Sequence, residues 1–235
     1  MNQKGILYGV GVGPGDPNLM TLQAVQKMQD CAVIACPETN GSHKVALAIA
    51  GKAVDLSNKT VLTLPFPMTR DENARQAAYQ DAVQRLEKRL EQGTDVAFLT
   101  LGDVSIYSTF AYLAQLAEAD GFQTEILPGV PSFSAVAAKL GIPIAIGAEP
   151  FHVIPASADL DALRDALQLP GTKVLMKSGK QIPEVLEALS ELDLLNNTSL
   201  VENCGLPEEK ILRAPTPEDA ADLGYIVTLI VRESL

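Results

Sequence analysis

Apolar and polar residues alternate in blocks along the first 140 positions, and these blocks predict strands and helices in turn. Short apolar runs at residues 6–12, 32–36, 61–64, 95–101 and 123–127 are typical of buried strands, and Gly, Pro or Asp residues follow them closely. Apolar strands that alternate with helices indicate an α/β domain whose sheet is mostly parallel and covered on both faces.

The helices between these strands are marked by apolar residues at helical spacing and by their ends. We expect them at residues 19–28, 69–92, 108–119 and 132–140. Thr69 and Glu72 form a capping-box pattern at the start of the second helix, and Gly93 supplies a left-handed stop at its end.

A segment rich in Gly and Pro, residues 141–150, separates this pattern from a second one. Beyond it we expect strands at 151–155, 173–177, 199–202, 211–213 and 225–231, with helices at 160–167 and 182–189. The last strand is rich in β-branched residues, so we place it in the centre of its sheet. The sequence thus predicts an N-terminal domain at 1–140 and a C-terminal α+β domain at 141–235.

Composition narrows the functional classes. The 235 residues include 18 Lys and Arg against 29 Asp and Glu, a formal net charge of −11, which argues against a protein that binds nucleic acid by neutralising phosphates. Three cysteines and two histidines do not suggest a disulfide framework or a metal site built by the protein. Since no leader-like or membrane-spanning segment is evident, we expect a soluble cytoplasmic protein.

A glycine-rich turn follows the first strand, with the sequence GVGVGPGDP at residues 9–17. The dinucleotide fingerprint G-x-G-x-x-G fails in register because its third glycine falls on Pro14 or Asp16. The run GK at 179–180 lacks the following Ser or Thr of a phosphate-binding loop. A tight turn without any ligand stays open as an alternative.

Two further turns follow strands and lead into helices. In LTLGDVSIYSTF, residues 99–110, Gly102 allows the backbone to approach a ligand, and Asp103 can either bind ribose hydroxyls or cap the following helix. The sequence LPGVPSFS at 127–134 repeats the arrangement, with helix amides that point outward.

These three motifs, in this order and at these separations, resemble the tetrapyrrole methylase family, which uses S-adenosylmethionine. Residues 107–110, YSTF, resemble the branch that methylates C-20 of precorrin-2 or cobalt-factor II in cobalamin biosynthesis. The resemblance implies the two-domain α/β fold of the class III methyltransferases, with S-adenosylmethionine in the cleft between the domains, a tetrapyrrole substrate and a homodimer. It implies no metal bound by the protein itself and no nucleic-acid or membrane partner.

The resemblance also assigns residues. Those expected at the cofactor are Leu101, Gly102, Asp103, Val104, Ile106, Tyr107, Ser132, Phe133, Met176 and Tyr225. Those expected at the tetrapyrrole are Gly13, Pro14, Gly15, Asp16, Arg70 and Lys177. Many members carry Gly-Asp-Pro where this chain has Val104, and the loss of the proline frees one backbone N–H and loosens the turn.

The carboxylates of such a substrate require local positive charge in an acidic protein. The candidates are His43, Lys44, Arg70, Arg75, Lys177 and Lys180, each of which is otherwise a solvated surface charge. Glu202 either orients a hydrogen bond near the cleft or caps a turn. Rival functions are methylation of uroporphyrinogen III, action on ribosomal RNA or on a diphthamide precursor within the same fold, and a non-catalytic carrier of S-adenosylmethionine or tetrapyrrole.

Overall fold

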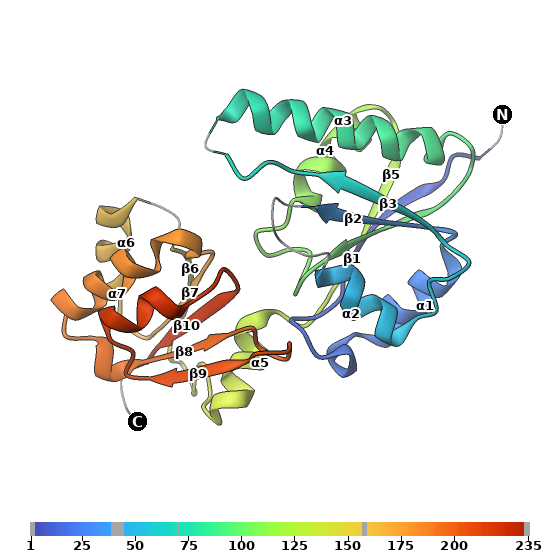
Figure 1. The fold of residues 1–235 in the computed structure, drawn as a ribbon. Helices are drawn as coiled ribbons and strands as arrows, with labels where there is room; N and C mark the ends of the chain where they lie inside the picture. Colours follow the sequence, from blue (N-terminus) through green and yellow to red (C-terminus); the bar gives the residue numbers. More distant parts are fainter. Residues whose placement is uncertain (1–2, 39–44, 70, 157–158, 233–235) are drawn as a thin grey trace. The chain divides into compact units, whose positions relative to one another are not determined.

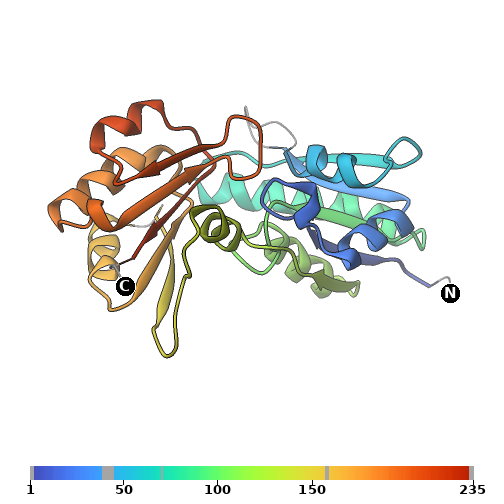
Figure 2. The ribbon, with the colours of Figure 1, turned by 90° about the horizontal axis from the view of Figure 1, so that it is seen from below.

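A computed structural model describes residues 3–38, 45–69, 71–156 and 159–232 (Figures 1 and 2). The chain divides into two compact units, Met1–Pro131 and Ser132–Leu235. The division falls before the helix at 132–140, whereas the sequence places it after that helix. Each unit has its own sheet and its own buried core.

The first unit is built on a five-stranded parallel sheet with the order β3-β2-β4-β1-β5. Its strands are β1 (Ile6–Gly11), β2 (Val33–Glu38), β3 (Thr60–Pro65), β4 (Val96–Thr100) and β5 (Gln123–Leu127). β1 lies between β4 and β5, with Leu7 opposite both Val96 and Thr124. The predicted parallel α/β sheet is therefore confirmed.

Helices cover both faces of this sheet (Figure 1). They are η1 (Pro17–Leu19), α1 (Leu22–Asp30), α2 (Val45–Ala53), α3 (Glu72–Leu90) and α4 (Phe110–Ala119). α3 and α4 lie on one face and α1 and α2 on the other. Large apolar side chains fill the core between the sheet and the helices α3 and α4. The ring centroids of Phe98 and Phe110 lie 5.9 Å apart in this core. The apolar spacing seen in the sequence is the buried face of these helices.

Two helix starts differ from the prediction. Thr21 interrupts the helix expected at 19–28, because its hydroxyl accepts the backbone N–H of Ala24 and so begins α1 at Leu22. Asp71, not Thr69, is the N-cap of α3, since its carboxylate accepts the N–H groups of Asn73 and Ala74. The Thr69 hydroxyl instead accepts the N–H of Asp71.

The sequence pattern does not predict the helix α2, and it ends the strand β2 too early. α2 contains the run VALAIAGKA, whose alanines favour a helix but whose apolar residues lack a clear polar face. Pro37 remains inside β2, although a proline is expected to end a strand. The pairing of β2 with β4 stops at Ala35, so the missing N–H of Pro37 costs no ladder hydrogen bond to β4.

The second unit holds a mixed five-stranded sheet with the order β6-β7-β10-β8-β9. Its strands are β6 (Phe151–Pro155), β7 (Thr172–Met176), β8 (Thr198–Glu202), β9 (Lys210–Arg213) and β10 (Val227–Val231). Within the described part of this second sheet only β6 and β7 pair in parallel, and β10 is central, as its β-branched sequence predicts.

The helices of this unit are α5 (Ser132–Leu140), α6 (Leu160–Leu167), η2 (Gly179–Gln181), α7 (Ile182–Glu191), η3 (Leu195–Asn197) and η4 (Pro217–Asp222). α5 packs against β10, and Arg213 donates a hydrogen bond of 3.0 Å to the carbonyl of Leu140 at the helix end. These contacts explain why α5 belongs to the second unit.

Candidate functional site

Three loops meet at the carboxyl edge of the first sheet. They follow β1, β4 and β5, which are neighbours in the strand order and run in parallel. Parallel strands end at the same edge, where open α/β sheets bind their ligands. The motifs at 9–17 and 99–110 and the first part of the third, residues 127–131, are therefore brought together within the first unit.

The first two loops are joined by a pair of backbone hydrogen bonds. Gly13 donates to the carbonyl of Gly102 at 3.2 Å, and Gly102 donates to the carbonyl of Gly13 at 2.8 Å. Both residues have positive φ, 73° and 77°, a conformation that favours glycine. A loop predicted to hold the tetrapyrrole and a turn predicted to hold the cofactor thus form one rigid pair.

The third loop packs against this pair by its backbone. A Cβ added to Gly129 would overlap the carbonyl oxygen of Gly102, and one added to Gly11 would lie 2.6 Å from the nitrogen of Gly129. Only residues without a side chain allow this approach. Gly11 and Gly129 are structural members of the site that the sequence motifs contained but that we did not single out.

Asp103 connects the second and third loops. Its Oδ2 accepts the N–H of Gly129 at 2.8 Å, and its Oδ1 accepts both the N–H and the hydroxyl of Ser105. The helix cap that we considered for Asp103 is wrong, because the hydroxyl of Ser108 accepts the N–H of Phe110 at the start of α4. Asp103 is 9% exposed, and its hydrogen bonds connect the turn after β4 to the turn after β5.

The other predicted cofactor residues of this unit lie along the same turn. The side chain of Val104 is 1% exposed and belongs to the core, which leaves only its backbone for a ligand. Leu101 and Ile106 are half-buried, and Tyr107 is 43% exposed with a φ of 49°. A positive φ at tyrosine is a strained conformation of the kind that gathers at binding sites.

The residues of the first unit that the resemblance assigns to the tetrapyrrole are mostly buried or already hydrogen-bonded within the protein. Pro14 and Gly15 are buried, and Asp16 caps η1 by accepting the N–H of Asn18 at 2.9 Å. Arg70 lies outside the described residues, as do His43 and Lys44.

In the second unit, two of the predicted residues, Ser132 and Met176, lie at the same end of the sheet. The hydroxyl groups of Ser132 and Thr228 form a hydrogen bond of 3.0 Å. Thr228 lies in β10, one residue before Leu229, which pairs with Leu175 of β7. Met176 ends β7 at the same end of that strand pair. Phe133 is 8% exposed and its ring meets that of Phe151 at 6.4 Å, so it acts mainly as packing.

The segment after β7 has an unusual backbone. Lys177 and Gly179 have positive φ, 58° and 50°, and a Cβ at Gly179 would lie 3.3 Å from the ring of Tyr225. Tyr225 is half-exposed. The pKa of Lys177 lies below its ordinary value because neighbouring protein displaces water from the ammonium group, although the side chain keeps solvent contact.

Two residues of this region were missed or left undecided from the sequence. Ser178 is 1% exposed and its hydroxyl has no hydrogen-bond partner among the described residues. Glu202 is 8% exposed, and its Oε1 accepts the N–H of Gly224 at 2.6 Å, so it anchors the segment that carries Tyr225. Its neighbour Asn203 has a φ of 52°. The turn sequence at 202–205 was the feature from which the role of Glu202 could have been predicted.

The described residues hold no group of three or more His, Cys, Asp or Glu placed to bind a metal ion. No helix in the described ranges has the length and apolar character needed to cross a membrane. Cys31, Cys36 and Cys204 are buried, and burial raises the pKa of Cys31 and of Cys204 to about 11.

Comparison with known proteins decides the family. Residues 6–219 match the model of the Tetrapyrrole (Corrin/Porphyrin) Methylases. The chain belongs to the tetrapyrrole methylases. Among tetrapyrrole methylases of solved structure, a uroporphyrin-III C-methyl transferase from Thermus thermophilus complexed with S-adenyl homocysteine shares the fold. Its TM-score is 0.72 at 19% identity, over 97% of this chain and 98% of that one.

Two curated tetrapyrrole methylases are more similar in sequence. A probable cobalt-precorrin-2 C(20)-methyltransferase from Methanocaldococcus jannaschii is 35% identical over 80% of this chain and 78% of its own length. The cobalt-precorrin-2 C(20)-methyltransferase from Salmonella typhimurium is 30% identical over 98% of this chain and 97% of its own length. The family that the motifs resemble is therefore confirmed.

Proposed function

We propose that this methyltransferase transfers a methyl group from S-adenosylmethionine to C-20 of precorrin-2, in its metal-free or cobalt-containing form. The observation that carries the proposal is 30% identity over 98% of the chain to a cobalt-precorrin-2 C(20)-methyltransferase. The YSTF sequence at 107–110 lies in the turn after β4, where the C-20 branch is expected to differ from its sister activities.

The residues at the two sheet edges suit S-adenosylmethionine. The backbones of Gly102 and Gly129 pack directly against each other in the turns after β4 and β5, and the buried hydroxyl of Ser178, after β7, has no partner among the described residues. We assign the cofactor to the turn at 101–107 together with Ser132, Phe133, Met176 and Tyr225. When bound, this cofactor supplies an electrophilic methyl group on a sulfonium.

The chain's own contribution to catalysis is alignment and exclusion of water. A meso carbon of an electron-rich tetrapyrrole is nucleophilic enough that the transfer itself needs no strong base, so no catalytic base is assigned. Holding the reacting groups in line supplies a large part of the rate enhancement. The Gly13–Gly102 bond pair and the Asp103 brace supply the rigidity that this requires.

We assign the substrate carboxylates to Lys177 and Arg70, and the ring edge to residues 13–16. Lys177 stands on a strained backbone, and its lowered pKa reports partial removal from water, which strengthens pairing with a carboxylate. A chain of net charge −11 needs such local cations to bind a polycarboxylate.

The test is anaerobic turnover with S-adenosylmethionine and one of three substrates: precorrin-2, cobalt-factor II or uroporphyrinogen III. One added methyl on either of the first two, located at C-20 by NMR, supports the proposal and identifies the metal state of the substrate. Methylation of uroporphyrinogen III alone would overturn the C-20 assignment and keep the family. S-Adenosylhomocysteine binding without any turnover would support a carrier.

Lys177→Asn gives a matched test of the carboxylate assignment. Asparagine tolerates the positive φ of this position, so the charge is removed without added backbone strain. We expect KM for the tetrapyrrole to rise about tenfold, as for a lost charge-assisted bond. Lys52→Gln, an exposed lysine of α2, serves as the charge control and leaves KM unchanged.

We further propose that the enzyme is a homodimer, on the strength of the family resemblance alone, and that it is cytoplasmic, because its three cysteines fit a reducing compartment. Size-exclusion chromatography with light scattering tests this. A mass near 50.0 kDa, twice 25.0 kDa, supports the dimer, and a mass near 25.0 kDa contradicts it.

A further inference from the structure

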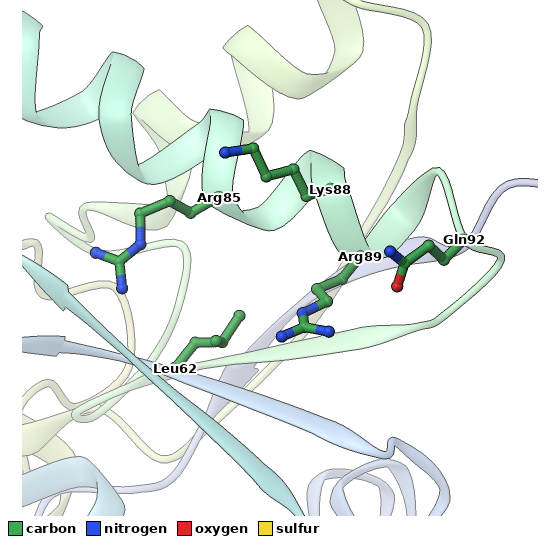
Figure 3. A pocket seen from close by; sticks show the side chains of 5 residues that line it. All are labelled: Leu62, Arg85, Lys88, Arg89 and Gln92. Atoms are coloured by element: carbon green, nitrogen blue, oxygen red, sulfur yellow. The ribbon is translucent and has the colours of Figure 1, made fainter.

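A pocket lies between α3 and β3 in the first unit, with a volume of about 310 Å³ (Figure 3). It is lined by Leu62, Arg85, Lys88, Arg89 and Gln92. Arg89 and Gln92 stand at the end of α3, shortly before β4 begins. The pocket thus extends toward the amino edge of the sheet, whereas the three glycine loops lie at its carboxyl edge.

The lining concentrates positive charge in an acidic protein. Arg85, Lys88 and Arg89 are spaced i, i+3 and i+4 along α3, so they share one side of the helix and repel one another. Asp81 lies 3.8 Å from Arg85, but Lys88 and Arg89 have no ion pair or hydrogen bond of their side chains within the described ranges. An anion in the pocket would relieve this repulsion.

One arginine is already held in place. Arg85 donates from Nη2 to the carbonyl of Thr63 at 2.9 Å, on the outer edge of β3, which is the edge strand of the sheet. Figure 3 shows Arg85 and Arg89 extending from α3 toward β3 on either side of Leu62. Arg85 is therefore a preorganised donor, and Arg89 is a second donor whose side chain has no hydrogen bond or ion pair within the described residues.

We propose that this pocket binds a small molecule through a phosphate or carboxylate group held by Arg85 and Arg89. Guanidinium groups bind both kinds of oxyanion in a bidentate manner. The volume is at the lower end for small-molecule sites, which favours a small anion over a protein segment. The site is separate from methyl transfer and does not depend on the function proposed above.

Isothermal titration calorimetry of the full chain tests the proposal, with sodium pyrophosphate and sodium succinate as probes at an ionic strength fixed with NaCl. We expect saturable binding of one molecule per chain for at least one probe, and the tighter probe identifies the group as phosphate or carboxylate. Arg89→Gln should weaken that binding about tenfold or more. Arg89→Lys keeps the positive charge but loses the bidentate geometry of the guanidinium group, so it should weaken binding less.

The matched control compares two exposed lysines of the same unit. Lys88→Gln should weaken binding severalfold because Lys88 lines the pocket, whereas Lys52→Gln removes the same charge from α2 and should change it less than twofold. Absence of saturable heat for both probes overturns the proposal, as does equal affinity in the wild type and Arg89→Gln. S-Adenosylhomocysteine binding by the same variants shows that they are folded and separates this result from that of the methylation assay.

Discussion

The carboxylate of Asp103 accepts the backbone N–H of Gly129 across 2.8 Å and so ties the turn after β4 to the turn after β5. Its other oxygen is occupied by Ser105. A residue expected to bind ribose is therefore already a structural acceptor. Any bond it makes to a ligand is made by a side chain whose position is fixed in advance.

Asp103→Asn tests this brace. An amide has one acceptor oxygen, so its NH₂ group must face one of two N–H donors, and we expect a loss of about 1–2 kcal/mol in the free energy of unfolding. S-Adenosylhomocysteine should bind several times more weakly. Urea denaturation and calorimetry measure the two effects.

Asp16→Asn is the control for that change. Asp16 caps η1 through a single oxygen, and asparagine caps about as well as aspartate, so its unfolding curve should match the wild type. Equal stability of Asp103→Asn and Asp16→Asn would contradict the role of Asp103 as a brace.

Gly129→Ala should damage the site more than its size suggests. The new Cβ overlaps the carbonyl of Gly102, which is itself bonded to Gly13, so all three loops must move. We expect a loss of about 2–3 kcal/mol in stability and loss of cofactor binding. Thermal denaturation with and without S-adenosylhomocysteine provides the measurement.

Gly51→Ala makes the same chemical change at an open position. Its Cβ meets only a methyl of Leu56 at 3.6 Å inside α2, so alanine should stabilise the helix by about 0.5–1 kcal/mol. If Gly129→Ala behaved like Gly51→Ala, the close packing of the loops would be disproved.

Glu202→Ala should loosen the segment that carries Tyr225. Without the Glu202 carboxylate the N–H of Gly224 loses its 2.6 Å partner, so hydrogen exchange at residues 223–226 should quicken while exchange in β10 stays slow. Glu202→Gln keeps an acceptor oxygen and should restore slow exchange. Fast exchange in both variants would mean that the charge, and not the acceptor, holds the segment.

Glu87 makes the stability of the first unit depend on pH. Burial, with Asp120 nearby, raises the pKa of Glu87 to about 6 from an ordinary value of 4.5. The native state therefore holds a proton that the unfolded chain releases, and the free energy of unfolding falls as pH rises from about 4.5 to 6.

Glu87→Gln removes this effect and tests it. Above pH 7 the variant should melt about 1–2 °C higher than the wild type, a modest gain because the carboxylate keeps some solvent. At pH 4 the two proteins should melt together, since glutamine resembles the protonated acid. A constant difference at all pH values would contradict the pKa shift as its cause.

Much of the fold was readable from the sequence because apolar periodicity reports burial. The parallel first sheet and the central position of β10 follow from runs such as residues 6–12 and 225–231. The sequence failed where pairing decides the outcome. Pro37 stays in β2 because β4 no longer pairs there, and no local pattern reveals where a neighbouring strand stops.

The candidate site was readable in its motifs but not in its connections. Gly13 and Gly102 were assigned to different ligands, and their mutual hydrogen bonds follow only from the placement of β1 beside β4. The hydroxyl of Ser178, which is buried and has no hydrogen-bond partner in the described part of the chain, likewise has no signature in the sequence. Serine is common at turns, and only burial makes this one notable.

The placement of β1 between β4 and β5 also affects how the chain folds during synthesis. β1 leaves the ribosome before both of its partners, β4 (Val96–Thr100) and β5 (Gln123–Leu127), which lie far downstream in the chain. Through that interval of synthesis its apolar side chains and open backbone are available to other chains, since non-local pairing is slow and exposes unpaired strands to aggregation. The glycine loop that follows β1 therefore reaches its contacts with Gly102 and Gly129 only after β4 and β5 have been synthesised, when the first unit is almost complete.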